Sequence, residues 1–143
     1  MNLSKVIFTL YTFIALSFAL FSSTYKVLFK EKPDIKENKV YFKGIPIGEV
    51  ENIYLSDRGF VTVEVSIEGK YRKFIKDTGV FYVEEGRLIY TLIEDKGSRI
   101  EPGSELLGFG TKAEYYLFKA KVKFGKLVES IERAIEELKE NKN

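Results

Sequence analysis

The first residues of this 143-residue chain contain a long uncharged run that limits what the N-terminus can form. No charged residue occurs from Val6 to Tyr25, and most side chains of the run are apolar. A bilayer core about 30 Å thick is crossed by about 20 helical residues. The run is longer than the about 7–15 apolar residues of a signal peptide, and no A-x-A cleavage pattern follows it. The sequence therefore predicts a retained transmembrane anchor over residues 1–25, with a cleaved signal peptide as the alternative.

The charges on either side of this run bear on which side of a membrane the rest of the chain lies. Lys5 precedes the run, whereas Lys26, Lys30 and Lys32 follow it. Positive residues concentrate on the cytoplasmic side, so this count favours a cytoplasmic C-terminus. Residues 26–39 mix lysines with acidic residues around one proline, which predicts a linker. Its lysines are either solvated or in contact with anionic headgroups.

The composition argues against several classes of function. The chain has 23 basic and 21 acidic residues, a balance that is too even for a dedicated nucleic-acid binder. It has no cysteine and no histidine, so it lacks disulfides, thiolate ligands and the most common general base. It also lacks the motifs of serine hydrolases, zinc proteases and phosphate-binding loops. We expect no enzymatic activity, and no catalytic residue, metal site or cofactor.

Alternating apolar residues follow the predicted linker. Between Phe60 and Ile67, valine or isoleucine occupies every second position, which predicts a half-buried strand. Further strands are predicted at residues 40–43, 49–55, 79–83, 88–93, 106–109 and 112–118. Short strands joined by glycine-bearing turns indicate a mainly β domain over residues 40–118, either a small barrel or a sandwich. Because no βαβ alternation is visible, we expect no parallel sheet.

The C-terminal residues 119–143 change to helical spacing. The apolar positions of this predicted amphipathic helix are Phe124, Leu127, Val128, Ile131, Ala134, Ile135 and Leu138. A stripe this narrow is typical of a coiled-coil seam, which would make these residues an oligomer interface. A helix of about two heptads is marginal alone, so the alternative is that it packs on its own β domain.

The segment from Val40 to Leu55, VYFKGIPIGEVENIYL, resembles the opening of a mammalian cell entry (MCE) domain. In that family a strand reaches a glycine, a short apolar turn reaches a second glycine, and G-x-V-x-x-I-x-L forms the next strand. Gly44 and Gly48 match the two glycines, which we interpret as turn positions. Two later segments, 74–81 and 100–106, are similar to further elements of the family, so the resemblance covers about residues 40–110.

The resemblance implies a seven-stranded MCE-type β-barrel that assembles into rings, commonly hexamers. Such rings are held at the inner membrane of double-membraned bacteria and face the periplasm. They serve in the transport of phospholipid or other hydrophobic substrates, together with an ABC permease and an ATPase. The chain would then be a non-enzymatic lipid-transport component. The alternative is a membrane-anchored scaffold of an envelope complex without transport.

The family's central pore is lined by an apolar loop between two late strands, and here the sequence departs from the pattern. At the expected position, residues 84–87 form a short charged turn. The one apolar loop with glycines contains Leu106, Leu107 and Phe109. These three residues are candidate lipid or pore contacts, or alternatively core side chains at one end of the barrel.

Overall fold

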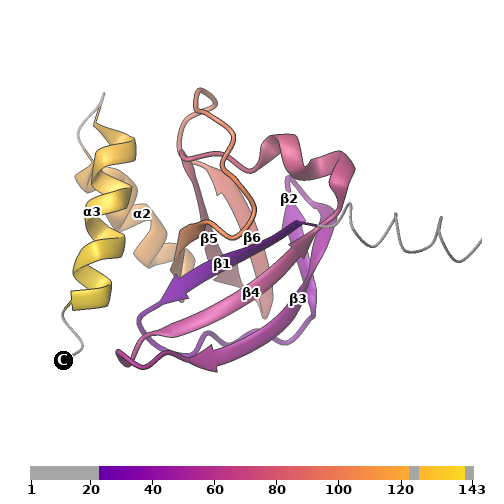
Figure 1. Ribbon diagram of the computed structural model, residues 1–143, viewed down its shortest axis with the longest axis horizontal. Coiled ribbons are helices and arrows are strands. Elements are labelled where there is room, and N and C mark those ends of the chain that lie inside the picture. The colour runs from indigo at the N-terminus through magenta and orange to yellow at the C-terminus, as the bar shows by residue number, and fades with distance from the viewer. Residues whose placement is uncertain (1–22, 123–125, 141–143) are drawn as a thin grey trace, which may run out of the picture.

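Seven strands close into a barrel in the computed structural model, which describes residues 23–122 and 126–140 (Figure 1). The strand order around the barrel is β1-β4-β3-β2-β6-β5-β7. The strands are β1 (Ser23–Phe29), β2 (Lys39–Phe42), β3 (Ile45–Leu55), β4 (Val61–Ile67), β5 (Gly79–Glu84), β6 (Arg87–Leu92) and β7 (Glu105–Phe109). A 3-10 helix, η1 (Gly69–Phe74), joins β4 to β5, and helices α2 (Lys112–Lys121) and α3 (Leu127–Glu140) follow the barrel. The mainly β fold and the seven-stranded barrel are confirmed.

The alternation of the sequence places the core inside the barrel. In β4, Val63, Val65 and Ile67 are fully buried in the central cluster, as the period of two predicts. Tyr25 and Phe29 of β1 join the same cluster from the neighbouring strand. Closure of the barrel leaves no free edge strand, which removes the sites at which sheets aggregate.

Strand β1 was not predicted. It lies where the sequence indicated the end of the anchor and the linker, and it pairs with β4 from Ser23↔Ile67 to Phe29↔Val61. Its alternation was hidden because its first residues continue the uncharged run. Residues 1–22 of the predicted anchor lie outside the described residues. The predicted transmembrane helix does not extend to Tyr25, because residues 23–25 belong to β1. Among the described helices, none has the length and apolarity needed to cross a bilayer.

The expectation of a sheet without parallel pairs is wrong. Strand β7 pairs in parallel with both β1 and β5, and β2 pairs in parallel with β6. The connections between these strands are loops and the short η1 rather than α-helices. The barrel closes through these parallel pairs. The alternation of apolar residues predicts strands but does not indicate which strands pair or in which direction.

Residues 112–118, predicted as a strand, form helix α2 instead. Thr111 caps this helix, since its hydroxyl oxygen accepts a hydrogen bond from the backbone N–H of Glu114 at 3.1 Å. The alternating aromatic residues of the segment misled the assignment, because Tyr115 is the only buried side chain of α2. The helix ends at Lys121, so the predicted helix 119–143 is not continuous: its described residues belong to the end of α2, to an extended Val122 and, after Lys126, to α3.

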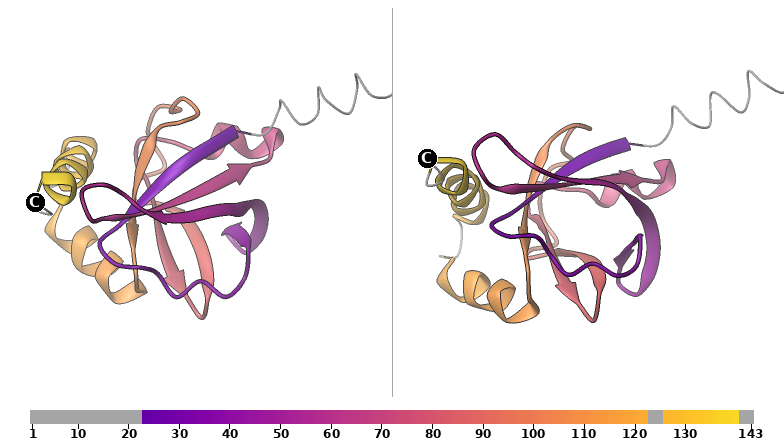
Figure 2. Two further views of the ribbon diagram at one scale, coloured as in Figure 1. Left: turned by 60° about the horizontal axis from the view of Figure 1, so that its bottom comes forward. Right: turned by 90° about the horizontal axis from the view of Figure 1, so that it is seen from below.

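Helix α3 packs on the outside of its own barrel, beside α2 (Figure 2). Its buried residues Leu127, Ile131, Ile135 and Leu138 follow helical spacing. They form a second cluster with outward-facing barrel residues, including Leu28, Phe60, Val80 and Leu107. Val128 is only half-buried, and Phe124 lies outside the described residues. The predicted oligomer face is therefore largely covered within the chain.

Candidate functional site

A groove opens where the two helices meet one end of the barrel. Its volume is about 750 Å³, and it is bordered by the β1–β2 loop, the β7–α2 segment, α2 and α3. Its apolar lining residues are Phe29, Leu107, Phe109, Leu117, Phe118 and Leu138. Ligand pockets in proteins commonly measure about 300–1,000 Å³, so this groove is large enough to take an acyl chain.

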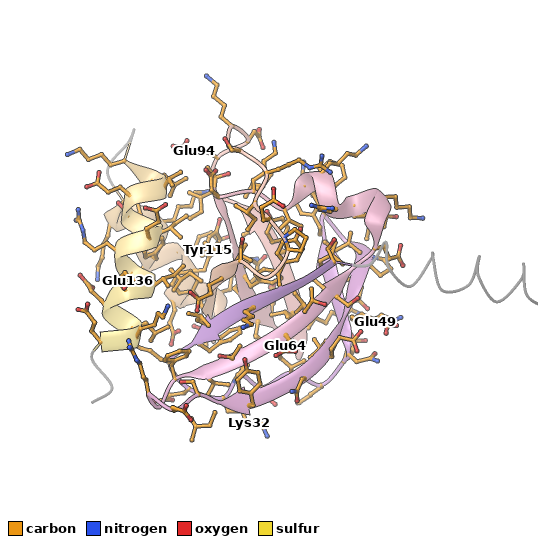
Figure 3. The ribbon with its side chains drawn as sticks, in the orientation of Figure 1. Lys32, Glu49, Glu64, Glu94, Tyr115 and Glu136 are labelled. Atoms are coloured by element: carbon orange, nitrogen blue, oxygen red, sulfur yellow. The ribbon has the colours of Figure 1, made fainter. Side chains whose placement is uncertain are left out.

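Aromatic contacts hold the apolar wall of the groove. The rings of Phe109 and Phe118 lie 5.2 Å apart, which holds the second half of α2 against the end of β7. Tyr115 stacks on Tyr82 of β5 with ring centroids 5.1 Å apart and planes within 8°. Figure 3 shows Tyr115 between the helices and the barrel. The wall is thus built from β5, β7 and α2 together.

Charged side chains surround the apolar floor. The lining includes the lysines 30, 32 and 121 and the acidic residues 31, 34, 114 and 137. Glu114 accepts a hydrogen bond from the backbone N–H of Gly110 at 3.2 Å and thereby closes the turn into α2. Lys139 of α3 pairs with Glu105 of β7 at 2.9 Å. The rim therefore mixes both signs and stabilises the position of the helices.

Two groups next to the groove wall have shifted pKa values. Burial raises the pKa of Tyr82, so its phenol stays neutral. A hydrogen bond to Glu84, at 3.4 Å, raises the pKa of Lys112 and keeps its ammonium charged. Within residues 23–122 and 126–140, no three acidic side chains converge as a metal site would require. The chemistry that this groove offers is the binding of apolar groups.

The structure separates the three predicted lipid contacts. Leu107 and Phe109 line the groove, whereas Leu106 points into the barrel core. Neighbouring strand residues face opposite sides, so Leu106 and Leu107 belong to different clusters. Leu117, Phe118 and Leu138 were missed as groove residues. The strand assignment of residues 112–118 hid the first two, and Leu138 was considered only as part of a helix seam.

The hairpin β5–β6 has the short charged turn that the sequence indicated. Its two central residues, Glu85 and Gly86, have φ values of 52° and 77°, as in a tight two-residue hairpin turn. Glu84 and Arg87 close the turn as paired strand residues. An apolar loop is therefore absent from this hairpin.

The two glycines that carried the family resemblance have different roles. Gly44 lies in the β2–β3 turn with φ of 80°, directly after Lys43 with φ of 52°, and so needs the left-handed conformation. Gly48 is not a turn residue, contrary to our interpretation, but lies within β3. A Cβ at Gly48 would overlap the backbone carbonyl oxygen of Ser66 on β4. Gly48 is required for close approach of two strands.

The closed seven-stranded barrel agrees with the MCE-type barrel that the resemblance of residues 40–110 implied. The family model described as MlaD protein matches residues 22–106, which is more than half of the chain. The chain belongs to the MlaD family.

A search of solved structures shows the same fold in a larger assembly. The chain is similar to one from the "Acinetobacter MlaFEDB complex in ATP-bound Vtrans1 conformation", with a TM-score of 0.50 and 17% identity. The match covers 75% of this chain and 90% of that one. A search of curated proteins gave no match.

Proposed function

We propose that this chain is a non-enzymatic component of a system that transports phospholipid or another hydrophobic substrate across the cell envelope. The family match over residues 22–106 is the observation that carries this proposal. The similar chain of known structure belongs to a complex described as ATP-bound, which supports an ABC permease and an ATPase as partners. The substrate of the transport system is then a lipid rather than a water-soluble solute.

The groove supports this function because it offers an apolar surface of the right size. Leu107, Phe109 and Leu117 present hydrocarbon to the space between α2, α3 and the barrel. Moving an acyl chain from water onto such a surface is favourable in proportion to the apolar area removed from water. In this account the groove holds part of a lipid while the rim charges stay solvated.

The proposal includes anchoring in the inner membrane, with the barrel in the periplasm and several copies arranged in a ring. Strand β1 starts at Ser23, within the uncharged run, so no linker separates the barrel from the rest of the run. Lys26 lies within this strand, and Lys30 and Lys32 follow its far end, about 20 Å along an extended strand from Ser23. These lysines are part of the folded barrel region and not of a short segment beside the membrane span. The charge count that favoured a cytoplasmic C-terminus is therefore a weaker argument against a periplasmic barrel.

A scaffold without transport is the second candidate, and the β5–β6 hairpin favours it. Its tight turn at Glu85 and Gly86 carries no apolar residue that could line a central pore. Leu106, one of the three predicted lipid or pore contacts, is buried in the core of its own barrel. A scaffold would hold the envelope complex together without binding lipid.

Lipid analysis of the full chain distinguishes these functions. We expect chains purified in mild detergent to retain phospholipid, quantified by extraction and mass spectrometry. Leu117, which is 60% exposed, lines the groove, so Leu117→Gln should retain several-fold less lipid. Ile45 is 52% exposed and lies away from the groove, so Ile45→Gln is the matched control and should retain the wild-type amount. Wild-type chains without lipid would favour the scaffold, and equal retention by both variants would exclude the groove.

A further inference from the structure

Helix η1 concentrates basic and aromatic side chains in a single turn. The basic residues are Lys70, Arg72 and Lys73, and the aromatic ones are Tyr71 and Phe74. The two lysine ammonium groups lie over the neighbouring rings, 5.0 Å from the centroid of Tyr71 and 5.3 Å from that of Phe74. Both rings pack against the barrel core, so the lysines point outward from a fixed base. We call residues 69–74 the η1 surface.

The η1 surface lies at the end of the barrel where the described chain begins. Ser23 pairs with Ile67, and η1 starts two residues after Ile67. The backbone N–H of Gly103 donates to the carbonyl oxygen of Thr24 at 2.7 Å, so the β6–β7 loop lies at the same end. Figures 1 and 2 show η1 beside the first residue of β1, with α2 and α3 on the far side of the barrel.

The position of this end limits its distance from a bilayer. The uncharged run continues into β1 without a linker, and each residue spans at most about 3.6 Å. If the run is anchored as proposed above, the barrel end that carries η1 is within reach of the lipid headgroups. The helices, at the other end of the barrel, are not.

The guanidinium of Arg72 lies at this end of the barrel, beside the phenol of Tyr25. Nε of Arg72 has no hydrogen-bond partner among the described residues, whereas Tyr25 is fully buried in the barrel core. Burial raises the pKa of Tyr25, so its hydroxyl keeps its proton and can donate. Arg72, Arg99 and Ser23 all lie close enough to influence this phenol. Phosphate oxygens are strong acceptors for a guanidinium, and the Arg72 side chain is partly exposed.

Acidic residues at the same end offset most of its charge, but none lies within the η1 surface itself. Glu68 lies 3.9 Å from Lys70, and Glu101 lies 3.7 Å from Arg72. The β6–β7 loop also contains Glu94, Asp95 and Lys96, and Asp77 accepts a hydrogen bond from the N–H of Ser98. Exposed pairs of this kind are weak and exchange readily.

The exposed face of α3, on the far side of the barrel, has the other sign. The exposed positions of α3 are Glu129, Glu132, Arg133, Glu136, Glu137 and Glu140. Figure 3 shows Glu136 on the outer side of this helix. An anionic surface would therefore attract η1 and repel α3, which gives the barrel a preferred orientation.

We propose that the η1 surface contacts the anionic phospholipid headgroups of the bilayer in which the chain is anchored. The inference rests on the anchoring in the proposed function. Lys70 and Lys73 supply the attraction to the surface, and the partly exposed guanidinium of Arg72 supplies donors to a headgroup phosphate. The contact orients the barrel so that α3 and the groove face away from the bilayer.

Single labels can test this contact because the chain contains no cysteine. Gly69→Cys places a bimane label on the η1 surface, and Glu136→Cys places one on the outer side of α3, both at exposed positions. The full chain is reconstituted in nanodiscs that contain a lipid with a nitroxide on its headgroup. The discs are made from phosphatidylcholine alone or from an equimolar mixture with phosphatidylglycerol. We expect strong quenching at residue 69 in the mixture, less in phosphatidylcholine, and little at residue 136 in either.

A charge-matched pair of variants tests the role of the lysines. Lys70→Gln with Lys73→Gln should weaken the contact about 30-fold. Each lysine near an anionic surface contributes about 1 kcal/mol to binding, and the loss of two such contributions corresponds to this factor. Lys119→Gln with Lys126→Gln removes the same charge from exposed positions elsewhere and should leave quenching at residue 69 unchanged.

The outcomes separate this inference from the proposed function. Chains retained in the discs with equal quenching at residues 69 and 136 would overturn the inference alone. Quenching at residue 69 that is the same in both lipid mixtures would show tethering without headgroup recognition and would also overturn it. Chains that are not retained in the discs would overturn the inference together with the proposed anchoring.

Discussion

The hydroxyl of Tyr90 on β6 donates a hydrogen bond to the carbonyl oxygen of Phe74, the last residue of η1, at 2.8 Å. The same hydroxyl accepts a hydrogen bond from the backbone N–H of Lys76 at 2.9 Å. Tyr90 is buried among the core aromatics, with Phe42 and Phe81 at centroid distances of 5.3 and 5.1 Å. One core side chain therefore fixes the position of η1 relative to the barrel.

Replacing Tyr90 with phenylalanine should destabilise the fold at neutral pH. The substitution keeps the ring but leaves the carbonyl of Phe74 and the N–H of Lys76 without this partner, which should cost about 1–3 kcal/mol. Urea unfolding followed by circular dichroism measures the loss. Tyr116→Phe, at a side chain that is 52% exposed, is the control and should change stability by less than about 0.5 kcal/mol. Equal stability of the two variants would contradict the role assigned to Tyr90.

The same residue predicts an alkaline limit of stability. Burial raises the pKa of Tyr90 above its value in the unfolded chain, which is about 10. The folded state then binds more protons than the unfolded state above about pH 10, so the free energy of unfolding should fall as pH rises through that range. Tyr90→Phe should show a shallower fall. Some slope should remain in the variant, because burial also raises the pKa of Tyr25 and Tyr82. Identical slopes would exclude Tyr90 as a cause.

The two signature glycines should respond differently to alanine. Gly44→Ala strains a left-handed turn with open space around it and should cost about 1–2 kcal/mol. Gly48→Ala drives a methyl group into the backbone of Ser66 and should cost about 3 kcal/mol or more. Thermal unfolding of the two variants compares them directly. A smaller loss for Gly48→Ala than for Gly44→Ala would contradict the close-approach role.

Helix α3 should stabilise the barrel from outside. Ile131 is 4% exposed and packs in the cluster that contains Leu107, so Ile131→Ala should cost about 2–4 kcal/mol. Glu132→Ala, at the adjacent exposed position, is the control and should cost less than about 0.5 kcal/mol. If Ile131→Ala instead left stability unchanged and dissociated an oligomer, the helix would act as a coiled-coil seam.

Much of the barrel could be predicted because its central strands alternate clearly. Strand β4 has valine or isoleucine at every inward position, and β3 follows Gly44 and contains Gly48. Strand β1 could not be predicted in the same way, because its inward Tyr25, Val27 and Phe29 adjoin an apolar run that predicts a membrane helix. The parallel pairs were missed because strand pairing across a barrel depends on tertiary closure.

The groove was only partly predictable. Leu107 and Phe109 could be identified because they lie in an apolar segment beside glycines. Leu117 could not, since a segment rich in aromatic residues favours a strand by propensity. The N-cap at Thr111 and the packing of Tyr115 on Tyr82 stabilise a helix in this segment instead. Local propensity is a weak guide where tertiary contacts compete with it.

The central claim is that the full chain assembles around phospholipid as part of a transport system. Native mass spectrometry of the chain released from mild detergent tests it most directly, because one spectrum reports subunit number and bound lipid together. The account predicts an oligomer whose mass exceeds that of its subunits by one or more phospholipids. A lipid-free monomer, under conditions that preserve known assemblies, would contradict it.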